Sequence, residues 1–426
     1  MSSPLTTNRP FLRLCAGQFL ALAAGYAVHF VSAILIEDMT HASGPMSGLV
    51  LSVVAPGLLA GLWAGALVDR YHRGNLLVLS LVLRGLAVMI FFLPISMDNW
   101  LPVIYLVNFL LAIFVQFEIT IEASLLPDLV DGTQLLAANG IFGVNTLAAQ
   151  GIGFLIVGPM LLRVDGLGAT GGAAALGFLI ALLIVATLFR RPRNAEHHWL
   201  DCTEPSTLDV YPIKPARAKD MLTSLWAGWK FVSTDYPTRK AVLHLTTVYT
   251  FLMVVVTLLP GFLSRVIGQS ADDFSLLALP TGVGFGIGIL IISRYGRRFD
   301  AGNLGDIGLA LAGLAMGIIA LWQGESGMLS ITLATPFVGM GLAFVIISAR
   351  TVLQSRPPAA LRGRVWAAQM VLSNAATLIP ILLSGNLADW IGIERVLLLT
   401  SLVILFIGSG NIPARLKNNF FKEARE

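Results

Sequence analysis

Long apolar runs separated by short polar connections make up most of this chain. Twelve runs come close to or exceed the 20 or so residues that an α-helix needs to cross the hydrocarbon core of a bilayer. They cover roughly residues 13–36, 46–68, 75–97, 101–121, 139–162, 170–189, 241–265, 273–293, 303–323, 327–349, 365–388 and 393–412. Helical segments of this length satisfy their own backbone hydrogen bonds in lipid. The pattern therefore predicts an all-α membrane protein with twelve transmembrane helices.

One long polar stretch, about 190–240, separates six runs from six. We expect an N-terminal six-helix bundle over residues 1–190 and a cytoplasmic linker with an amphipathic segment over 191–240. A C-terminal six-helix bundle with a cytoplasmic tail is expected over 241–426. Two six-helix repeats around a site at mid-membrane are an architecture of secondary transporters.

A short basic motif repeats between the predicted halves. Arg70-Tyr71-His72-Arg73 follows the second run, and Arg294-Tyr295-Gly296-Arg297 follows the eighth at an equivalent place. The repeat indicates a duplicated six-helix unit and thus two pseudo-symmetric bundles.

Composition supports the membrane assignment. Hydrophobic residues make up 56% of the 426 residues and charged residues only 12%, with a mean hydropathy of +0.80. A soluble globular protein carries roughly 25% charged residues, so the composition excludes that class.

Most of the 28 Lys and Arg residues fall at the termini, in the 190–240 stretch or in the even-numbered connections. Because cytoplasmic loops carry the positive excess, we expect a multi-pass protein of the inner (plasma) membrane with both termini cytoplasmic.

The connection after the second run carries a more specific signal. Gly65-Ala-Leu-Val-Asp69-Arg70-Tyr-His-Arg73 resembles the G-x-x-x-D-R-x-G-R signature of the major facilitator superfamily. The resemblance implies the fold of that family, and it implies that Gly65, Asp69, Arg70 and Arg73 form a cytoplasmic conformational latch. In this role Asp69 would meet the start of the eleventh helix. The alternative is a short turn with charges that stop membrane insertion.

Other segments resemble the macrolide-efflux and enterobactin-exporter-like branch of the drug:proton antiporters. They are Leu126-Pro127-Asp128-Leu129-Val130, Arg84, Gly228-Trp229-Lys230-Phe231, Arg362-Gly363-Arg364-Val365 and Gly385-Asn-Leu-Ala-Asp389. Gly153 with Gly158-Pro159 in the fifth run partly matches the G-x-x-x-G-P element of proton-exchanging exporters. Glycine permits close helix contact and proline bends a helix, so a purely structural role stays open.

Ionisable residues inside a membrane span are costly and indicate function by default. Glu118 and Glu122 are four residues apart and share one helix face. We expect Glu118 to bind a coupling proton with Arg84 as its partner, and Glu122 and His29 are further candidates for proton coupling. A structural Arg84–Glu118 ion pair, glutamates that reach cytoplasmic water, and a structural His29 are the alternatives.

The family architecture implies a substrate cavity lined by helices 1, 4, 7 and 10. Its candidate residues are Gln18, Tyr26, Phe117, His244, Tyr249, Met253 and Phe344. Aromatic and Met side chains adapt to varied apolar ligands, which suits an amphiphilic substrate. The same residues could instead serve helix packing or lipid contact.

Several classes of site are absent from the sequence. There is no G-x-x-x-x-G-K-[ST] phosphate loop, nucleic-acid motif or catalytic cluster. The glycine-rich run Gly282 to Gly288 indicates close helix packing, and Glu196 to Cys202 indicates a polar loop rather than a metal site. We expect no enzyme activity, cofactor or resident metal.

The sequence as a whole predicts a secondary active transporter, and the family resemblance narrows this to proton-coupled efflux of a drug, macrolide or siderophore. Its expected partners are the small-molecule substrate, protons and membrane lipids, with no nucleic acid, and we expect a monomer. A lipid or lysophospholipid transporter on the same fold is the first alternative. A membrane sensor or enzyme is a remote one.

Overall fold

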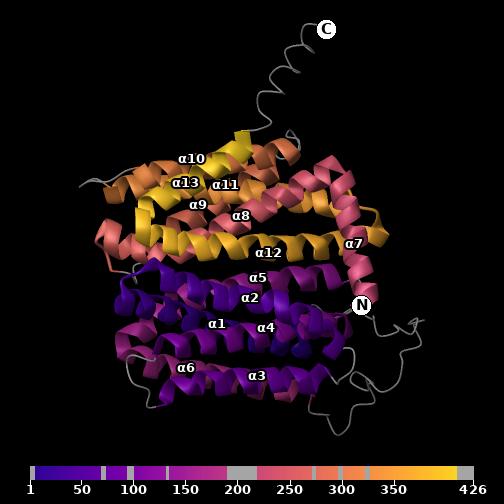
Figure 1. Ribbon diagram of the computed structural model, residues 1–426. Coiled ribbons are helices and arrows are strands. Elements are labelled where there is room, and N and C mark those ends of the chain that lie inside the picture. The colour runs from indigo at the N-terminus through magenta and orange to yellow at the C-terminus, as the bar shows by residue number, and fades with distance from the viewer. Residues whose placement is uncertain are drawn as a thin grey trace. The chain divides into compact units, whose positions relative to one another are not determined.

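The structure is a computed structural model that is all-helical over the residues it describes (Figure 1). These residues are 5–68, 73–93, 100–130, 134–189, 218–270, 275–295, 301–321 and 327–409.

The helices of the first half follow the predicted apolar runs. They are α1 (Arg9–Thr40), α2 (Ser43–Val68), α3 (Arg73–Met89), α4 (Trp100–Leu129), α5 (Leu135–Ile152) and α6 (Gly158–Phe189), with the short 3-10 helices η1 (Leu5–Thr7) and η2 (Ile90–Phe92). A π-helical turn, η5 (Gly153–Val157), joins α5 to α6. The sequence predicts a connection near residues 163–169, whereas the structure keeps these residues within helix α6.

The second half begins with the segment that precedes the seventh predicted span. It is helix α7 (Ala218–Thr234), and the helices after it are α8 (Tyr236–Gly261), the π-helical η6 (Phe262–Ile267), α9 (Ser275–Tyr295), α10 (Ala301–Leu321), α11 (Gly327–Ser355), α12 (Ala359–Ile391) and α13 (Ile393–Ser409). Asp235 caps α8 by accepting the backbone N–H of Thr238 at 3.0 Å, which supplies one partner that a helix start otherwise lacks.

Within the described residues, ten segments are long and apolar enough to cross a membrane. The two further predicted spans correspond to α2 and to α13, which has 17 residues. Large apolar side chains such as Trp390, Phe406 and Val164 are more than three-quarters exposed. Such exposure is costly in water but not in hydrocarbon, so the structure agrees with the predicted membrane fold.

Contacts divide the chain into two compact units. The first unit comprises residues 1–38 and 52–216, and the second comprises residues 39–51 and 217–426. The beginning of α2 therefore groups with the second unit, although the rest of this helix groups with the first.

Close backbone contacts hold the second unit together. A Cβ atom at Gly284 of α9 would overlap the carbonyl oxygen of Pro336 in α11, and one at Gly339 would overlap the carbonyl oxygen of Thr281. The two helices can approach this closely only because both positions are glycine. The prediction of close packing for the Gly282–Gly288 run is thus confirmed at Gly284, whereas Gly282 faces open space.

The segment α7 packs against the core of the second unit. Its Val232 lies in a buried cluster with Leu245 of α8, Leu353 of α11 and Val365 of α12. A Cβ at Gly228 would overlap the carbonyl of Arg364, so α7 lies directly on the first turns of α12.

Candidate functional site

A buried ion pair joins α3 to α4 in the first unit. Nη1 of Arg84 donates a hydrogen bond to Oε2 of Glu118, and the side chains of both residues are less than 5% exposed. Nη2 of Arg84 also donates to the carbonyl oxygen of Ala21 in α1 at 3.0 Å. The charge of Glu118 is therefore balanced inside the bundle, where an unpaired carboxylate would be very unfavourable.

Two neighbours fix the position of the Arg84 guanidinium. It lies over the ring of Phe178 in α6, with Cζ 4.5 Å from the ring centroid. On another side it lies against Gly25 of α1, where a Cβ atom would come within 2.5 Å of Nη2. The pair with Glu118 thus depends on a cation–π contact and on a glycine that leaves room for the side chain.

Glu122 lies one helical turn beyond Glu118 and is also buried. Its Oε2 accepts a hydrogen bond from Nε2 of Gln18 at 3.0 Å. Oε1 of Gln18 in turn accepts a bond from Nδ2 of Asn145 in α5 at 2.8 Å, and Asn145 also donates to the carbonyl of Cys15. The two glutamates therefore lie in neighbouring polar groups, Glu118 with Arg84 of α3 and Glu122 with Gln18 of α1 and Asn145 of α5.

His29 takes part in a second polar group on α1. Its Nδ1 is hydrogen-bonded to Oδ1 of Asn108 in α4, and Nδ2 of Asn108 donates to Ser32 at 2.9 Å. The ring of Tyr26 meets the His29 ring edge-on, with the centroids 5.7 Å apart. The structure thus gives His29 a fixed neutral partner, and it brings Tyr26 to the same face of α1.

The second unit contains its own buried charge cluster. Nζ of Lys240 in α8 donates to Oδ2 of Asp306 in α10, and Nε2 of His244 lies 3.1 Å from Oδ1 of the same carboxylate. All three side chains are less than 10% exposed. A Cβ at Gly305 would overlap the His244 ring, so α10 approaches α8 closely at this point.

The other candidate cavity residues lie in different surroundings. Tyr249 accepts a hydrogen bond from Arg350 of α11 at 3.3 Å, and Phe344 is buried against Gly308 of α10. Phe117 and Met253 are half-buried.

An apolar cavity of about 370 Å³ lies within the second unit. Its lining comes from the second half of α8 and α10, the first residue of η6, the first half of α9, α11 up to Leu342, and the start of α13. Three Phe rings (Phe251, Phe262 and Phe285) contribute to it, and the hydroxyls of Thr281 and Thr335 donate to carbonyls of their own helices. The lining does not include His244, Tyr249, Met253 or Phe344.

The Gly-Pro element coincides with the π-helical turn η5. A Cβ at Gly153 would overlap the carbonyl of Ala23 in α1, and one at Gly158 would come 2.7 Å from the ring of Phe30. Pro159 follows directly and has no backbone N–H to donate. These residues therefore combine a local change of helix geometry with very close packing on α1.

Part of the predicted latch falls outside the described residues, because Asp69 and Arg70 lie there. Gly65 lies in α2, and Nη1 of Arg73 at the start of α3 pairs with Oδ2 of Asp128 at 2.8 Å, on the surface of the unit. The segment 196–202 also lies outside, and the part of the chain that is described holds no group of three or more potential metal ligands.

Comparison with known proteins decides the family. The sequence pattern of the Major Facilitator Superfamily matches residues 14–381. The chain belongs to the Major Facilitator Superfamily.

Two known proteins resemble the chain over most of its length. Multidrug efflux pump Tap of Mycolicibacterium fortuitum is 26% identical over 379 residues, which cover 85% of this chain and 86% of the pump. The uncharacterized MFS-type transporter YfiS of Bacillus subtilis is 24% identical, covering 96% of this chain and 94% of its own. These relatives support transport as the function and agree with the expectation that the chain is no enzyme.

Solved structures show the same major facilitator fold. A bacterial homologue of the iron transporter ferroportin, in an inward-facing state, has a TM-score of 0.70 at 15% identity and covers 95% of this chain and 98% of its own. A bacterial homologue of the human lysosomal transporter Spinster has a TM-score of 0.65 at 15% identity, covering 95% and 96%.

Sequence reasoning missed several polar residues of this superfamily member. Asn108 and Asn145 lie inside predicted spans, where an amide needs a partner as much as a charge does. Asp306 lies inside the ninth predicted span, and the rule that singled out Glu118 applies to it equally. Lys240 stands one residue before a predicted span, so only the structure shows that it is buried.

Proposed function

We propose that this transporter exports an amphiphilic small molecule in exchange for protons by alternating access. The observation that carries the proposal is the buried Arg84–Glu118 pair with Glu122 one turn away. A group that couples proton movement to a conformational change must be able to exist with and without its proton in the same protein. Glu118 fits this requirement, because Arg84 balances its charge when the proton is absent.

Charge balance explains how protonation changes the structure. When Glu118 takes up a proton, Arg84 loses its counter-ion and turns toward other acceptors, such as the Ala21 carbonyl that it already contacts. Glu122, held by Gln18, is a second carboxyl one turn away on the same helix face. Protonation thereby alters contacts of α1, α3 and α4 together.

The substrate class follows from two observations. The relative at 26% identity is named a multidrug efflux pump. The apolar cavity of the second unit offers aromatic rings and no hydroxyl that is not already bonded within its own helix. Both favour a compound with a substantial apolar part, and a macrolide, a lipophilic drug or a siderophore meets this description.

The proposed setting is the inner membrane, with both termini and the polar stretch 190–240 in the cytoplasm. The distribution of Lys and Arg carries this orientation. We propose a monomer, since each unit of the transporter fold is complete within one chain.

Everted membrane vesicles test the proposal. Uptake of ethidium, erythromycin and a lysophospholipid is measured with an imposed proton gradient and again after addition of a protonophore. We expect gradient-dependent uptake of ethidium or erythromycin by the parent protein and none by Glu118→Gln. The control Glu394→Gln removes a carboxylate from the first turn of α13 and should transport like the parent.

Two results would contradict the proposal. Full gradient-dependent uptake by Glu118→Gln would remove Glu118 from the coupling step. Uptake of the lysophospholipid alone, by a route that the protonophore does not affect, would favour the lipid transporter instead.

A further inference from the structure

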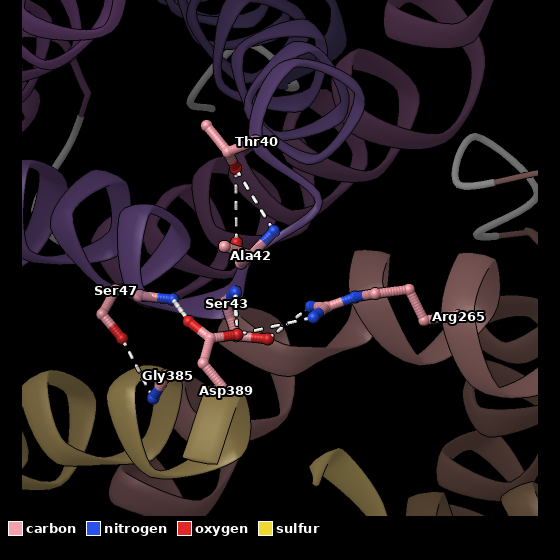
Figure 2. Close-up of polar contacts among 8 residues, drawn as sticks. Thr40, Ala42, Ser43, Ser47, Arg265, Gly385 and Asp389 are labelled. Carbon is pink, nitrogen blue, oxygen red and sulfur yellow. Dashed lines mark hydrogen bonds and ion pairs between the residues drawn. The ribbon is translucent and has the colours of Figure 1, made fainter.

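Asp389, near the end of α12, binds the beginning of α2. Its Oδ1 accepts the backbone N–H of Ser43 at 2.6 Å, and its Oδ2 accepts that of Gly44 at 2.6 Å (Figure 2). The first N–H groups of a helix have no partner within the helix, and they carry a partial positive charge. A carboxylate that takes two of them makes short, charge-assisted bonds.

Arg265 of η6 completes this arrangement. It donates to the Ser43 hydroxyl and reaches Oδ1 of Asp389 at 3.4 Å (Figure 2). The side chains of Arg265 and Asp389 are 28% and 31% exposed. Both charges can therefore be hydrated when the contact opens, so separation does not leave a charge buried.

One helical turn further along α2, the hydroxyl of Ser47 bonds to two backbone groups of α12. Oγ of Ser47 donates to the carbonyl of Ile381 at 2.7 Å and accepts the N–H of Gly385 at 3.1 Å. These are the two groups that an α-helix normally joins directly. A Cβ at Gly385 would overlap Ser43 and Ser47, so the contact requires glycine at this position.

We propose that Asp389, Arg265, Ser43, Ser47 and Gly385 form a releasable clamp on the first turns of α2. The clamp holds residues 39–51 on the second unit, whereas the rest of α2 belongs to the first unit. A transporter that alternates between two conformations needs contacts of this kind, strong when formed and hydrated when broken. The clamp holds one of the two conformations and opens in the other, whatever the transported compound is.

A pair of cysteines beside these contacts tests the clamp. A Cβ at Gly44 would lie 3.1 Å from Oδ1 and 3.8 Å from Cγ of Asn386, so the side chains of two cysteines at these positions would reach each other. The variant Gly44→Cys/Asn386→Cys is made in a background with Cys15→Ala and Cys202→Ser. We expect it to cross-link rapidly under mild oxidation.

The first readout is the cross-linking rate, which needs no substrate. Asp389→Ala, or Asp389→Asn if the first variant does not fold, should slow cross-linking about tenfold, because two charge-assisted bonds are lost. Gly385→Ala should do the same for steric reasons. The controls Glu394→Gln and Gly286→Ala, where a Cβ would meet open space, should not change the rate. An unchanged rate in folded Asp389 and Gly385 variants would overturn the proposal.

The second readout is export of ethidium, and this arm rests on the proposed function. The oxidised double-cysteine protein should not transport, and reduction should restore its activity. Full transport by the cross-linked protein would mean that the clamp stays closed throughout the cycle, which contradicts the proposal. Absence of ethidium transport in the reduced protein would count against the proposed substrate class, while the cross-linking rates still decide the role of Asp389.

Discussion

Gly25 of α1 makes room for the guanidinium of Arg84, because a Cβ atom at Gly25 would come within 2.5 Å of Nη2. This relationship leads to the first prediction. Gly25→Ala should push Arg84 away from Glu118 and lower the stability of the purified protein by about 1–3 kcal/mol, as overpacking usually does. Thermal unfolding in detergent measures the loss.

The matched control for this prediction is Gly143→Ala in the same unit, because a Cβ at Gly143 meets open space. The control should unfold at the same temperature as the parent. If Gly25→Ala is as stable as Gly143→Ala, the close contact between Gly25 and Arg84 does not hold in the protein.

The second prediction concerns the coupling between Arg84 and Glu118. Arg84→Met leaves a carboxylate buried without its counter-ion, which typically costs about 3–5 kcal/mol. Glu118→Gln resembles the protonated carboxyl and leaves the guanidinium with the Ala21 carbonyl as an acceptor, so it should cost less than Arg84→Met. The double variant should lose much less than the sum of the two losses, since neither charge then remains unpaired. Additive losses in thermal unfolding would show that the two side chains do not interact.

The third prediction separates the charge cluster of the second unit from proton coupling. Asp306→Asn should destabilise the protein, because Lys240 and His244 lose the carboxylate between them. Adding Lys240→Met to the Asp306→Asn protein should recover part of the lost stability. The ratio of protons to exported compound should stay that of the parent, as we assign coupling to Glu118.

An exposed pair gives the comparison for this third prediction. Asp128 pairs with Arg73 at the surface of the first unit, and exposed pairs contribute at most about 1 kcal/mol. Asp128→Asn should therefore have little effect on unfolding.

A change in the ratio of protons to exported compound caused by Asp306→Asn would contradict this third prediction, because it would require a second coupling site.

The fourth prediction tests the apolar cavity. Gly282 lies in its lining, and a Cβ at this position meets open space. Gly282→Leu should fit without a clash and fill part of the cavity, so the KM for a bulky apolar compound should rise by about tenfold, which corresponds to a loss of about 1.4 kcal/mol of binding. Gly286→Leu is the control, since Gly286 also faces open space but lies outside the lining. Equal KM values for the two variants would exclude the cavity as a substrate site.

The sequence predicts the fold well, because a helix that crosses the hydrocarbon core of a bilayer needs a long run of mostly apolar residues. Runs of about 20 apolar residues can be recognised without knowing any contact, and all twelve correspond to helices in the structure. The residues at which the helices begin and end are less predictable. The connection expected between the fifth and sixth spans is helical in the structure, although Asp165-Gly166 and Gly168 are residues typical of a turn.

The polar contacts could be predicted only in part. Arg84 and Glu118 stand out because each is a charge inside an apolar run, and the structure places them in contact. The clamp at Asp389 could not be foreseen in this way. Its partners are backbone N–H groups of Ser43 and Gly44, and every sequence has such groups, so only the fold shows which of them a carboxylate reaches.

Proton flux in proteoliposomes tests the central claim most directly. Purified protein is reconstituted with a pH-sensitive dye inside the vesicles, and a gradient of the transported compound is imposed. The account predicts that the parent moves protons against the compound and that Glu118→Gln moves none, while Glu394→Gln behaves like the parent. Proton movement of parental size by Glu118→Gln would contradict the account.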